Sequence, residues 1–122
     1  MKYRATITSW GPDALGFLEE EGCHFLIIFN EDAPPELAEI AVLHTKAELT
    51  ADPVVGDTLT LCGKTFKITA IGDEALHTLR QLGHCTLTFT GGSEPERPGC
   101  IMLEGEAITT AEITKGGTIE IA

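Results

Sequence analysis

Basic residues are scarce in this sequence: eight lysines and arginines stand against 19 aspartates and glutamates, which gives a formal net charge of −11. Proteins bind a phosphate backbone through cationic side chains that release counterions, so this balance argues against a nucleic-acid partner. It argues equally against binding to an anionic membrane surface. It is compatible with a basic protein partner, because complementary electrostatic fields speed encounter.

Long hydrophobic runs are also lacking. The longest, Phe25–Phe29, has the length of a strand and falls far short of the roughly 20 apolar residues that span a bilayer. The N-terminal residues contain no hydrophobic signal region. We therefore expect a cytoplasmic protein with no direct membrane insertion. A length of 122 residues predicts a single domain over residues 1–122.

Cysteines at metal-binding or redox spacing are absent as well. The chain has four cysteines, at positions 23, 62, 85 and 100, and none are two or three residues apart. In a cytosolic protein they are expected to be thiols. Cys23 precedes His24 and His84 precedes Cys85, which suggests zinc. Adjacent strand residues point to opposite faces, however, so neither pair can easily share a metal. We expect no bound metal, and a zinc-binding domain stays a minor alternative.

The sequence does contain many short β segments separated by turns. Residues 2–10 alternate, with Tyr3, Ala5 and Ile7 on one face, which is typical of a half-buried strand. Other segments are apolar on both faces or form a hairpin around residues 62–64. The predicted strands are residues 2–10, 24–29, 40–43, 58–61, 65–69, 84–90, 100–103 and 118–121.

One segment has a clear helical pattern. Leucines at positions 76, 79 and 82 share a face, Asp73 is the expected N-terminal cap, and Gly83 suits the left-handed residue that ends a helix. We expect this helix over residues 74–82. Residues 33–36 predict a turn or the first turn of a short helix, where proline is tolerated. The predicted fold class is mainly β, a small barrel-like folded sheet with one or two short helices.

The candidates for chemistry are histidines, because the phosphate-loop, nucleophile-elbow and His-Glu-x-x-His motifs are all absent. His24 begins an apolar strand, and a hydrogen-bonded structural role is expected for it. His77 lies off the leucine face of the helix and is expected to be solvated. His44 ends the apolar run Ile40–Leu43, whereas His84 follows Gly83 on the threonine face of its strand. The pattern alone favours a structural role for each of these two as well.

Several segments resemble a known family. They are Ile27–Leu37 followed by Val42-Leu43-His44 and Glu48-Leu49, then Ile68–Gly72, then Leu79–Gly91 with its Leu-Gly-His-x-Thr strand, and Pro98-Gly99. Over nearly the whole chain, the sequence is similar to the glucitol/sorbitol-specific IIA component of the bacterial phosphoenolpyruvate-dependent sugar phosphotransferase system. The resemblance implies a compact, β-rich, barrel-like domain.

The resemblance also implies a function. It implies a phosphotransferase whose His44 accepts a phosphoryl group from the phosphocarrier HPr. The group then passes to a cysteine of the IIB part of the glucitol/sorbitol transporter, so the expected partners are HPr and the transporter's IIB and IIC components. Thr45 and Lys46 depart from the family pattern, and neither is expected to be catalytic. The alternative is a non-catalytic regulatory domain that kept the barrel.

A histidine suits this chemistry because a neutral imidazole nitrogen is nucleophilic near neutral pH. The loose transition state of phosphoryl transfer requires mainly positioning and stabilisation of the phosphoryl oxygens, so we expect no cofactor. We predict that His44 is accessible to solvent with one ring nitrogen free. We predict that His84 lies nearby and assists by donating a hydrogen bond to a phosphoryl oxygen. In the alternative, His84 bonds a free carbonyl at the helix end.

Overall fold

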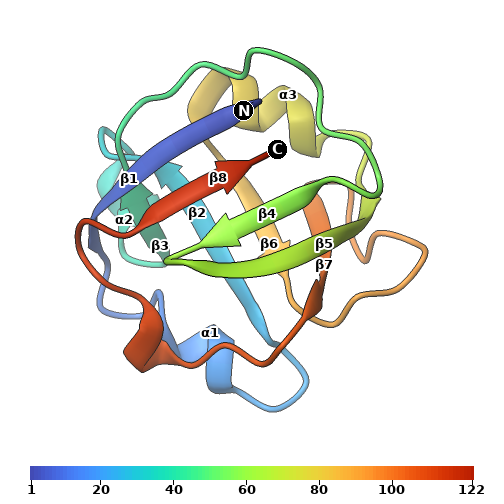
Figure 1. The fold of residues 1–122 in the computed structure, drawn as a ribbon. Coiled ribbons are helices and arrows are strands. Elements are labelled where there is room, and N and C mark those ends of the chain that lie inside the picture. The colour runs from blue at the N-terminus through green and yellow to red at the C-terminus, as the bar shows by residue number, and fades with distance from the viewer.

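The computed structural model describes residues 1–122 as eight strands that close into a barrel (Figure 1). Around the barrel the order is β1-β3-β2-β6-β7-β5-β4-β8. The strands are β1 (Tyr3–Trp10), β2 (Phe25–Asn30), β3 (Ala41–His44), β4 (Thr58–Leu61), β5 (Lys64–Ile71), β6 (Cys85–Thr88), β7 (Cys100–Gly105) and β8 (Thr118–Ile121). The predicted fold class is confirmed.

Two of the eight strand pairs are parallel, β2 with β3 and β6 with β7, and the other six are antiparallel. Parallel neighbours need a crossover connection. In β2–β3 that connection contains helix α2 (Pro35–Ala38), and in β6–β7 it is the loop over residues 89–99. Because β2 and β3 run the same way, their last residues, Asn30 and His44, lie side by side in register.

The core fills the inside of the barrel with alternate residues of each strand. The expected face of β1, formed by Tyr3, Ala5 and Ile7, is buried to 1% exposure. On β2 and β3 the buried core residues are Leu26, Ile28 and Val42. The same alternation places Asn30 and His44 on the inward side of their strands. The predicted period of two is therefore what aims the histidine at the end of the barrel interior.

Four short helical segments cover the barrel. Helix α1 (Gly16–Glu19) and the 3₁₀ turn Thr110–Glu112 lie at one end of the barrel, whereas α3 (Ala75–Leu82) lies across the other (Figure 1). The short helix expected after residue 33 is α2, with Pro35 at its start. The structure thus has more helices than the one or two predicted. Four-residue helices such as α1 are too short to show a helical period.

Two details of α3 differ from the prediction. Asp73 is not the cap: the helix begins after Glu74, which occupies the N-cap position, and no side chain makes a capping hydrogen bond there. Leu82 is 46% exposed rather than buried. Ala75 and Leu79, four residues apart, form the face that packs on the barrel core, and Leu82 lies outside it. Gly83 has φ +63°, as expected of the left-handed residue at a helix end.

Two further predictions concern the cysteines and the membrane. All four cysteines are free thiols; Cys85 and Cys100 are buried, and Cys23 and Cys62 are partly exposed. Burial raises the pKa of the Cys85 thiol to about 12, with a smaller contribution from nearby Cys100. None of the helices combines the length and the hydrophobicity needed to cross a bilayer.

Candidate functional site around His44

His44 is the last residue of β3 and lies between two neighbouring strands, opposite Ile7 of β1 and Asn30 of β2. Its ring meets the ring of Tyr3 edge-on, with the centroids 6.3 Å apart and the planes at 84°. Tyr3 belongs to the barrel core, and its burial raises its pKa. One edge of the imidazole is therefore fixed by the core, and the other faces the end of the barrel.

Both ring nitrogens of His44 face backbone carbonyls. Nδ1 lies 2.8 Å from the carbonyl oxygen of Thr45, and Nε2 lies 2.8 Å from that of Gly83. The side chain is fully buried, with 0% exposure. The prediction of an accessible ring with one free nitrogen is therefore wrong. The reason is tertiary: a turn 39 residues further along the chain covers the end of β3.

The two carbonyl partners constrain the protonation of the ring. A neutral imidazole has one N–H and can donate to one carbonyl only, whereas an imidazolium donates to both. The carbonyl of Gly83 belongs to the C-terminal end of α3. In the closed arrangement both nitrogens of His44 therefore face hydrogen-bond acceptors, and neither is open to an incoming phosphoryl group.

The cover over His44 is the segment Leu82–His84, which we call the α3 turn. The Gly83 N–H donates to the carbonyl of Leu79 (2.9 Å), and the His84 N–H donates to that of Thr78 (3.2 Å). A Cβ built on Gly83 would overlap Oδ1 of Asn30 and lie 2.7 Å from Cε1 of His44. Glycine therefore serves two purposes here: it ends the helix in the left-handed region and lets the turn rest directly on the imidazole.

His84 holds the α3 turn against the outside of the barrel. Its Nδ1–H donates to the carbonyl of Ile28 (3.1 Å), and its ring lies 4.7 Å from the ring of Phe29 at 34°. Phe29 is not part of the barrel core cluster, so this contact is on the outer face of β2, whereas the His44 ring is on the inner side. The partner is a strand carbonyl, not a free carbonyl of the helix. The assisting role of His84 stays a prediction.

Asn30 is the polar neighbour of His44 that sequence reasoning missed. Its Oδ1 is buried and has no hydrogen-bond partner. The signal was present in the sequence: Asn30 follows Leu26 and Ile28 at alternate positions of an apolar strand, so its side chain had to face inward. A polar side chain at an inward position next to a candidate histidine is a reason to consider a functional role.

Two of the residues that follow β2 and β3 form an exposed ion pair. Lys46 Nζ lies 2.8 Å from Oδ2 of Asp32, with both side chains more than half exposed. The lysine lowers the pKa of Asp32, and the carboxylate raises the pKa of Lys46. An exposed pair of this kind contributes little to stability. The ion pair matters for its position, because Lys46 places a positive charge on the surface two residues after His44.

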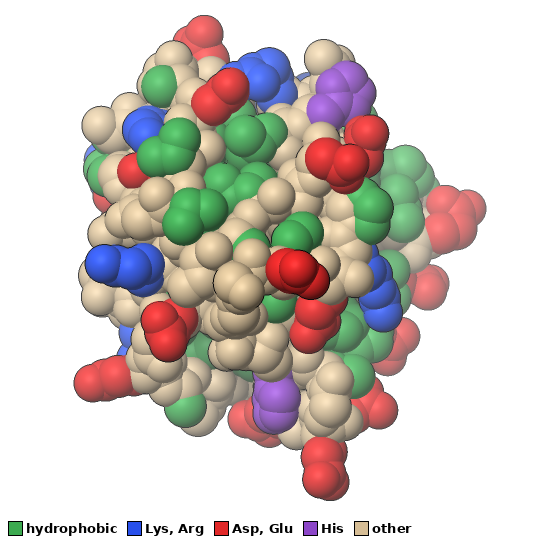
Figure 2. All heavy atoms as spheres, turned by 90° about the vertical axis from the view of Figure 1, so that its right-hand side faces the viewer, with side chains coloured by type: hydrophobic (Ala, Val, Ile, Leu, Met, Phe, Trp, Pro, Cys, Tyr) green, Lys and Arg blue, Asp and Glu red, His purple; other side chains and the backbone are tan.

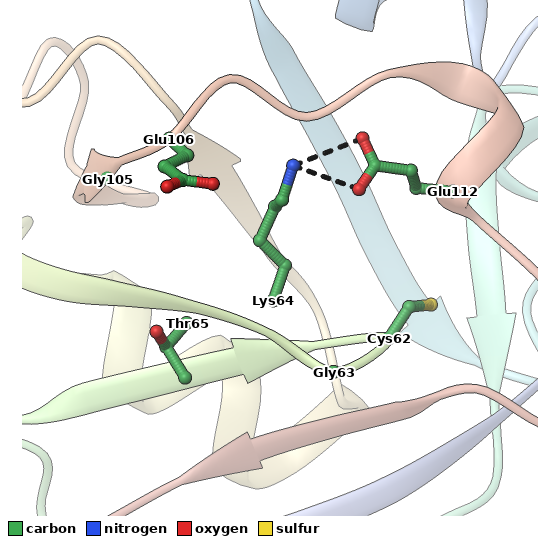
Figure 3. A pocket seen from close by; sticks show the side chains of 7 residues that line it. All are labelled: Cys62, Gly63, Lys64, Thr65, Gly105, Glu106 and Glu112. Atoms are coloured by element: carbon green, nitrogen blue, oxygen red, sulfur yellow. Dashed lines mark hydrogen bonds and ion pairs between the residues drawn. The ribbon is translucent and has the colours of Figure 1, made fainter.

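The largest cavity lies elsewhere, at the β4–β5 turn (Figure 3). It measures about 550 Å³, and His44 is not among the residues that line it. Lys64 reaches across it to Glu112 (2.9 Å) and to the carbonyl of Ala107 (2.7 Å). The same ion pair lowers the pKa of Glu112, with a further contribution from the backbone of Thr109. The cation is already paired, so this cavity offers no free charge to a phosphate.

The other two histidines are not part of the site. His77 is exposed on α3, as predicted. His24 is exposed as well, and its Nδ1 lies 3.3 Å from the carbonyl oxygen of Leu18. No group of three or more His, Cys, Asp or Glu side chains is arranged to hold a metal ion. The zinc-binding alternative is therefore not favoured.

Comparison with a solved structure first defines the class of protein. The crystal structure of a PTS system IIA component from Enterococcus faecalis V583 superposes with a TM-score of 0.78, covering 96% of this chain and 97% of that one at 25% sequence identity. The closed barrel is thus the fold of a sugar phosphotransferase system (PTS) IIA component.

Sequence comparison then gives the family. The family model for the PTS system glucitol/sorbitol-specific IIA component matches residues 2–120. The glucitol/sorbitol-specific EIIA components of Escherichia coli (strain K12) and Shigella flexneri are each 37% identical over 103 residues, covering 84% of this chain and 81% of theirs. The chain belongs to the glucitol/sorbitol-specific IIA component family, and a phosphocarrier role follows from that membership.

Proposed function

We propose that this protein carries a phosphoryl group on Nε2 of His44, between phosphorylated HPr and a cysteine of the IIB component of a glucitol/sorbitol transporter. The observation that carries the proposal is that the two ring nitrogens have different partners: Nδ1 bonds a carbonyl that is fixed to the barrel wall, and Nε2 contacts a carbonyl of the α3 turn. Nδ1 bonds the carbonyl of the next residue, Thr45. Thr45 is itself tied to β1 by one backbone bond, from its N–H to the carbonyl of Thr6, and by one side-chain bond, from the Thr6 N–H to its Oγ1. Nε2 faces only the α3 turn.

Transfer then requires the α3 turn to move off the ring. A phosphoryl group on Nε2 would occupy the place of the Gly83 carbonyl, and its oxygens would be repelled by that carbonyl and by the negative end of the helix dipole. Few interactions hold the turn down: the Gly83 carbonyl on His44, the bond from His84 to Ile28, and the contact with Phe29. Such sparse anchoring is typical of segments that open locally.

Opening also prepares the nucleophile. When the Gly83 carbonyl withdraws, Nε2 loses the group that covers it, while Nδ1–H stays on the carbonyl of Thr45 and leaves the lone pair of the ring on Nε2. The lone pair of Nε2 attacks phosphorus, and the phosphorus–nitrogen bond of the donor breaks with its electron pair returning to the donor imidazole. In the second transfer a cysteine thiolate attacks phosphorus, and the electron pair of the broken bond returns to Nε2 of His44.

In this proposal His84 acts by positioning the α3 turn. Its Nδ1–H is committed to Ile28, so its ring fixes where the turn closes and how far it swings. Replacing it by glutamine keeps a polar side chain but removes the ring that stacks on Phe29. We expect such a protein to accept phosphate more slowly than the wild type, since the turn no longer returns to one position. Direct donation from His84 to a phosphoryl oxygen would give the same direction with a larger loss.

The experiment is phosphorylation of the purified protein by Enzyme I, HPr and phosphoenolpyruvate, with acid-labile, base-stable phosphate as the readout. The wild type is expected to take up one phosphate, His44→Gln none, and His84→Gln the same amount more slowly. His77→Gln is the matched control, because His77 is exposed on α3 away from the site, and it should behave as the wild type. Uptake by His44→Gln, or no uptake by the wild type, contradicts the proposal.

A further inference from the structure

The side-chain oxygen Oδ1 of Asn30 is buried, and it makes no hydrogen bond in the closed structure. It is one of three buried side-chain oxygen or nitrogen atoms without a hydrogen-bond partner in the whole chain. Leaving such an atom unpaired costs free energy that an apolar residue of similar size would not cost. An orphaned polar group next to a reactive side chain points to a partner that is present in another state of the protein.

The position of Asn30 identifies that partner. It lies opposite His44 in the parallel β2–β3 pair, with its side chain on the same inward side. Its Oδ1 and Cε1 of His44 both lie against Gly83, at the point where a side chain at residue 83 would begin. Cε1 lies between the two ring nitrogens, and Nε2 is the one that contacts Gly83, so the carboxamide lies at the edge of the ring that the α3 turn covers. Once the turn lifts, the carboxamide borders the space that a group on Nε2 would fill.

We propose that Asn30 is a further catalytic residue, whose carboxamide donates a hydrogen bond to an oxygen of the phosphoryl group on His44. Rotation about the last side-chain bond of asparagine exchanges its oxygen for its NH₂ group, because that torsion is soft. The other groups on the ring nitrogens, the carbonyls of Thr45 and Gly83, are acceptors that repel phosphate. The charge of a loose transition state is spread over the phosphoryl oxygens, so a fixed donor there favours transfer.

A second buried polar atom without a hydrogen-bond partner lies near the His44 ring and provides a control variant. The hydroxyl of Tyr3 is also buried and unpartnered, and the Tyr3 ring contacts His44 edge-on. Tyr3 is a barrel core residue, and the atoms nearest to a Cβ on Gly83 belong to Asn30 and His44 rather than to Tyr3. Tyr3→Phe therefore removes a buried polar atom beside His44 without removing a donor from the phosphoryl position.

The inference rests on the proposed function, and its test separates the two. The equilibrium between phosphorylated HPr and this protein is measured for the wild type, Asn30→Leu, Asn30→Asp and Tyr3→Phe, together with the thermal unfolding midpoint of each unphosphorylated protein. Asn30→Leu is expected to unfold at the same or a higher temperature, because an unpaired polar atom is gone. Its phosphorylation equilibrium should fall about tenfold, the loss of one hydrogen bond to a charged group.

The two remaining variants distinguish a hydrogen-bonding role of Asn30 from a purely structural one. Asn30→Asp keeps the size but puts a carboxylate beside the phosphoryl oxygens, so its equilibrium should fall further than that of Asn30→Leu. Tyr3→Phe should leave the equilibrium unchanged. A destabilised Asn30→Leu protein with a wild-type equilibrium overturns the inference and assigns Asn30 a purely structural role. Failure of the wild type to take up phosphate would instead contradict the proposed function.

A variant-free measurement covers the case in which a substitution prevents folding. In ¹⁵N-labelled protein, the side-chain NH₂ signal of Asn30 should shift on phosphorylation and show scalar coupling to ³¹P across the hydrogen bond. A side-chain signal that is the same before and after phosphorylation overturns the inference.

Discussion

At the scale of single residues, the site depends on a histidine that is buried rather than exposed to solvent. His44 has 0% exposure and two carbonyl partners, whereas exposure was the natural expectation for a phosphate acceptor. Protection has a chemical consequence, because a buried ring whose two nitrogens face carbonyls is closed to stray electrophiles. The residue that makes it possible is Gly83, which allows a backbone carbonyl to rest on the ring.

Replacing Gly83 by alanine tests this close contact. The new Cβ is strained by the left-handed backbone and overlaps Asn30 and His44, so we expect a loss of about 2–4 kcal/mol in the free energy of unfolding. Gly22→Ala is the matched control, since Gly22 has φ +84° but nothing within 4 Å of a Cβ; it should lose only about 1 kcal/mol. Denaturant unfolding measures both.

The same variant reports on the cover itself. Diethyl pyrocarbonate, which acylates neutral imidazole nitrogens, should label exposed His77 but not His44 in the wild type. In Gly83→Ala the displaced turn should let His44 react, as peptide mass spectrometry would show. Equal destabilisation of the two glycine variants, with His44 protected in both, would contradict the packing described around residue 83.

At the scale of elements, the β2–β3 strand pair belongs to the barrel wall, whereas the α3 turn is attached to it by few interactions. The parallel β2–β3 pair lies in the barrel wall between β1 and β6 and fixes both His44 and Asn30. The α3 turn rests on this pair through one side chain and one carbonyl. Motion is therefore expected at the end of α3, while the strands that carry the reactive groups stay in place.

Hydrogen exchange can locate this motion. We expect the amides of Gly83 and His84 to exchange faster in the phosphorylated protein, because the displaced turn exposes its two capping bonds to water. Amides of the β4–β5 hairpin, on strands that do not contact the α3 turn, should be unchanged and serve as the internal control. Exchange at residues 83 and 84 that is identical in the two forms would mean that phosphate reaches His44 without movement of the turn.

The elements also show how far sequence reasoning reaches. The alternation of Tyr3, Ala5 and Ile7 predicts β1 and its buried face, because a strand's period is local. Gly83 is identified as a helix end from its neighbours alone. The burial of His44 could not be found this way, since it comes from a residue 39 positions away. Leu82 was misplaced for a related reason: helical spacing indicates which residues share a face, but not how wide the buried face is.

At the scale of the whole molecule, the formal net charge of −11 gives the protein an acidic surface. Figure 2 shows acidic side chains spread over one face, with isolated basic groups and hydrophobic side chains between them. Lys46, two residues after His44, is paired with Asp32, so its charge is largely compensated. A partner with a basic face would be attracted over a broad area, and the local contacts would then set the final orientation.

This field predicts a salt-dependent rate. Transfer from phosphorylated HPr should slow as ionic strength rises, because the Debye length shrinks to about 8 Å at physiological salt and about 3 Å at 1 M. Stopped-flow or rapid-quench kinetics from low to high salt, with the phosphorylation equilibrium measured in parallel, separates an effect on encounter from one on stability. Rates that do not change with salt would show that the acidic surface serves solubility alone.

The chemistry at His44 can be observed in the ring nitrogens themselves. Long-range ¹H–¹⁵N spectra of the resting protein should show Nδ1 of His44 protonated and donating to the carbonyl of Thr45. After phosphorylation, ³¹P coupling should appear on Nε2 of His44, with Nδ1 still protonated. Phosphorus on Nδ1, or on any other histidine, would contradict the account of a phosphoryl group carried beneath the α3 turn.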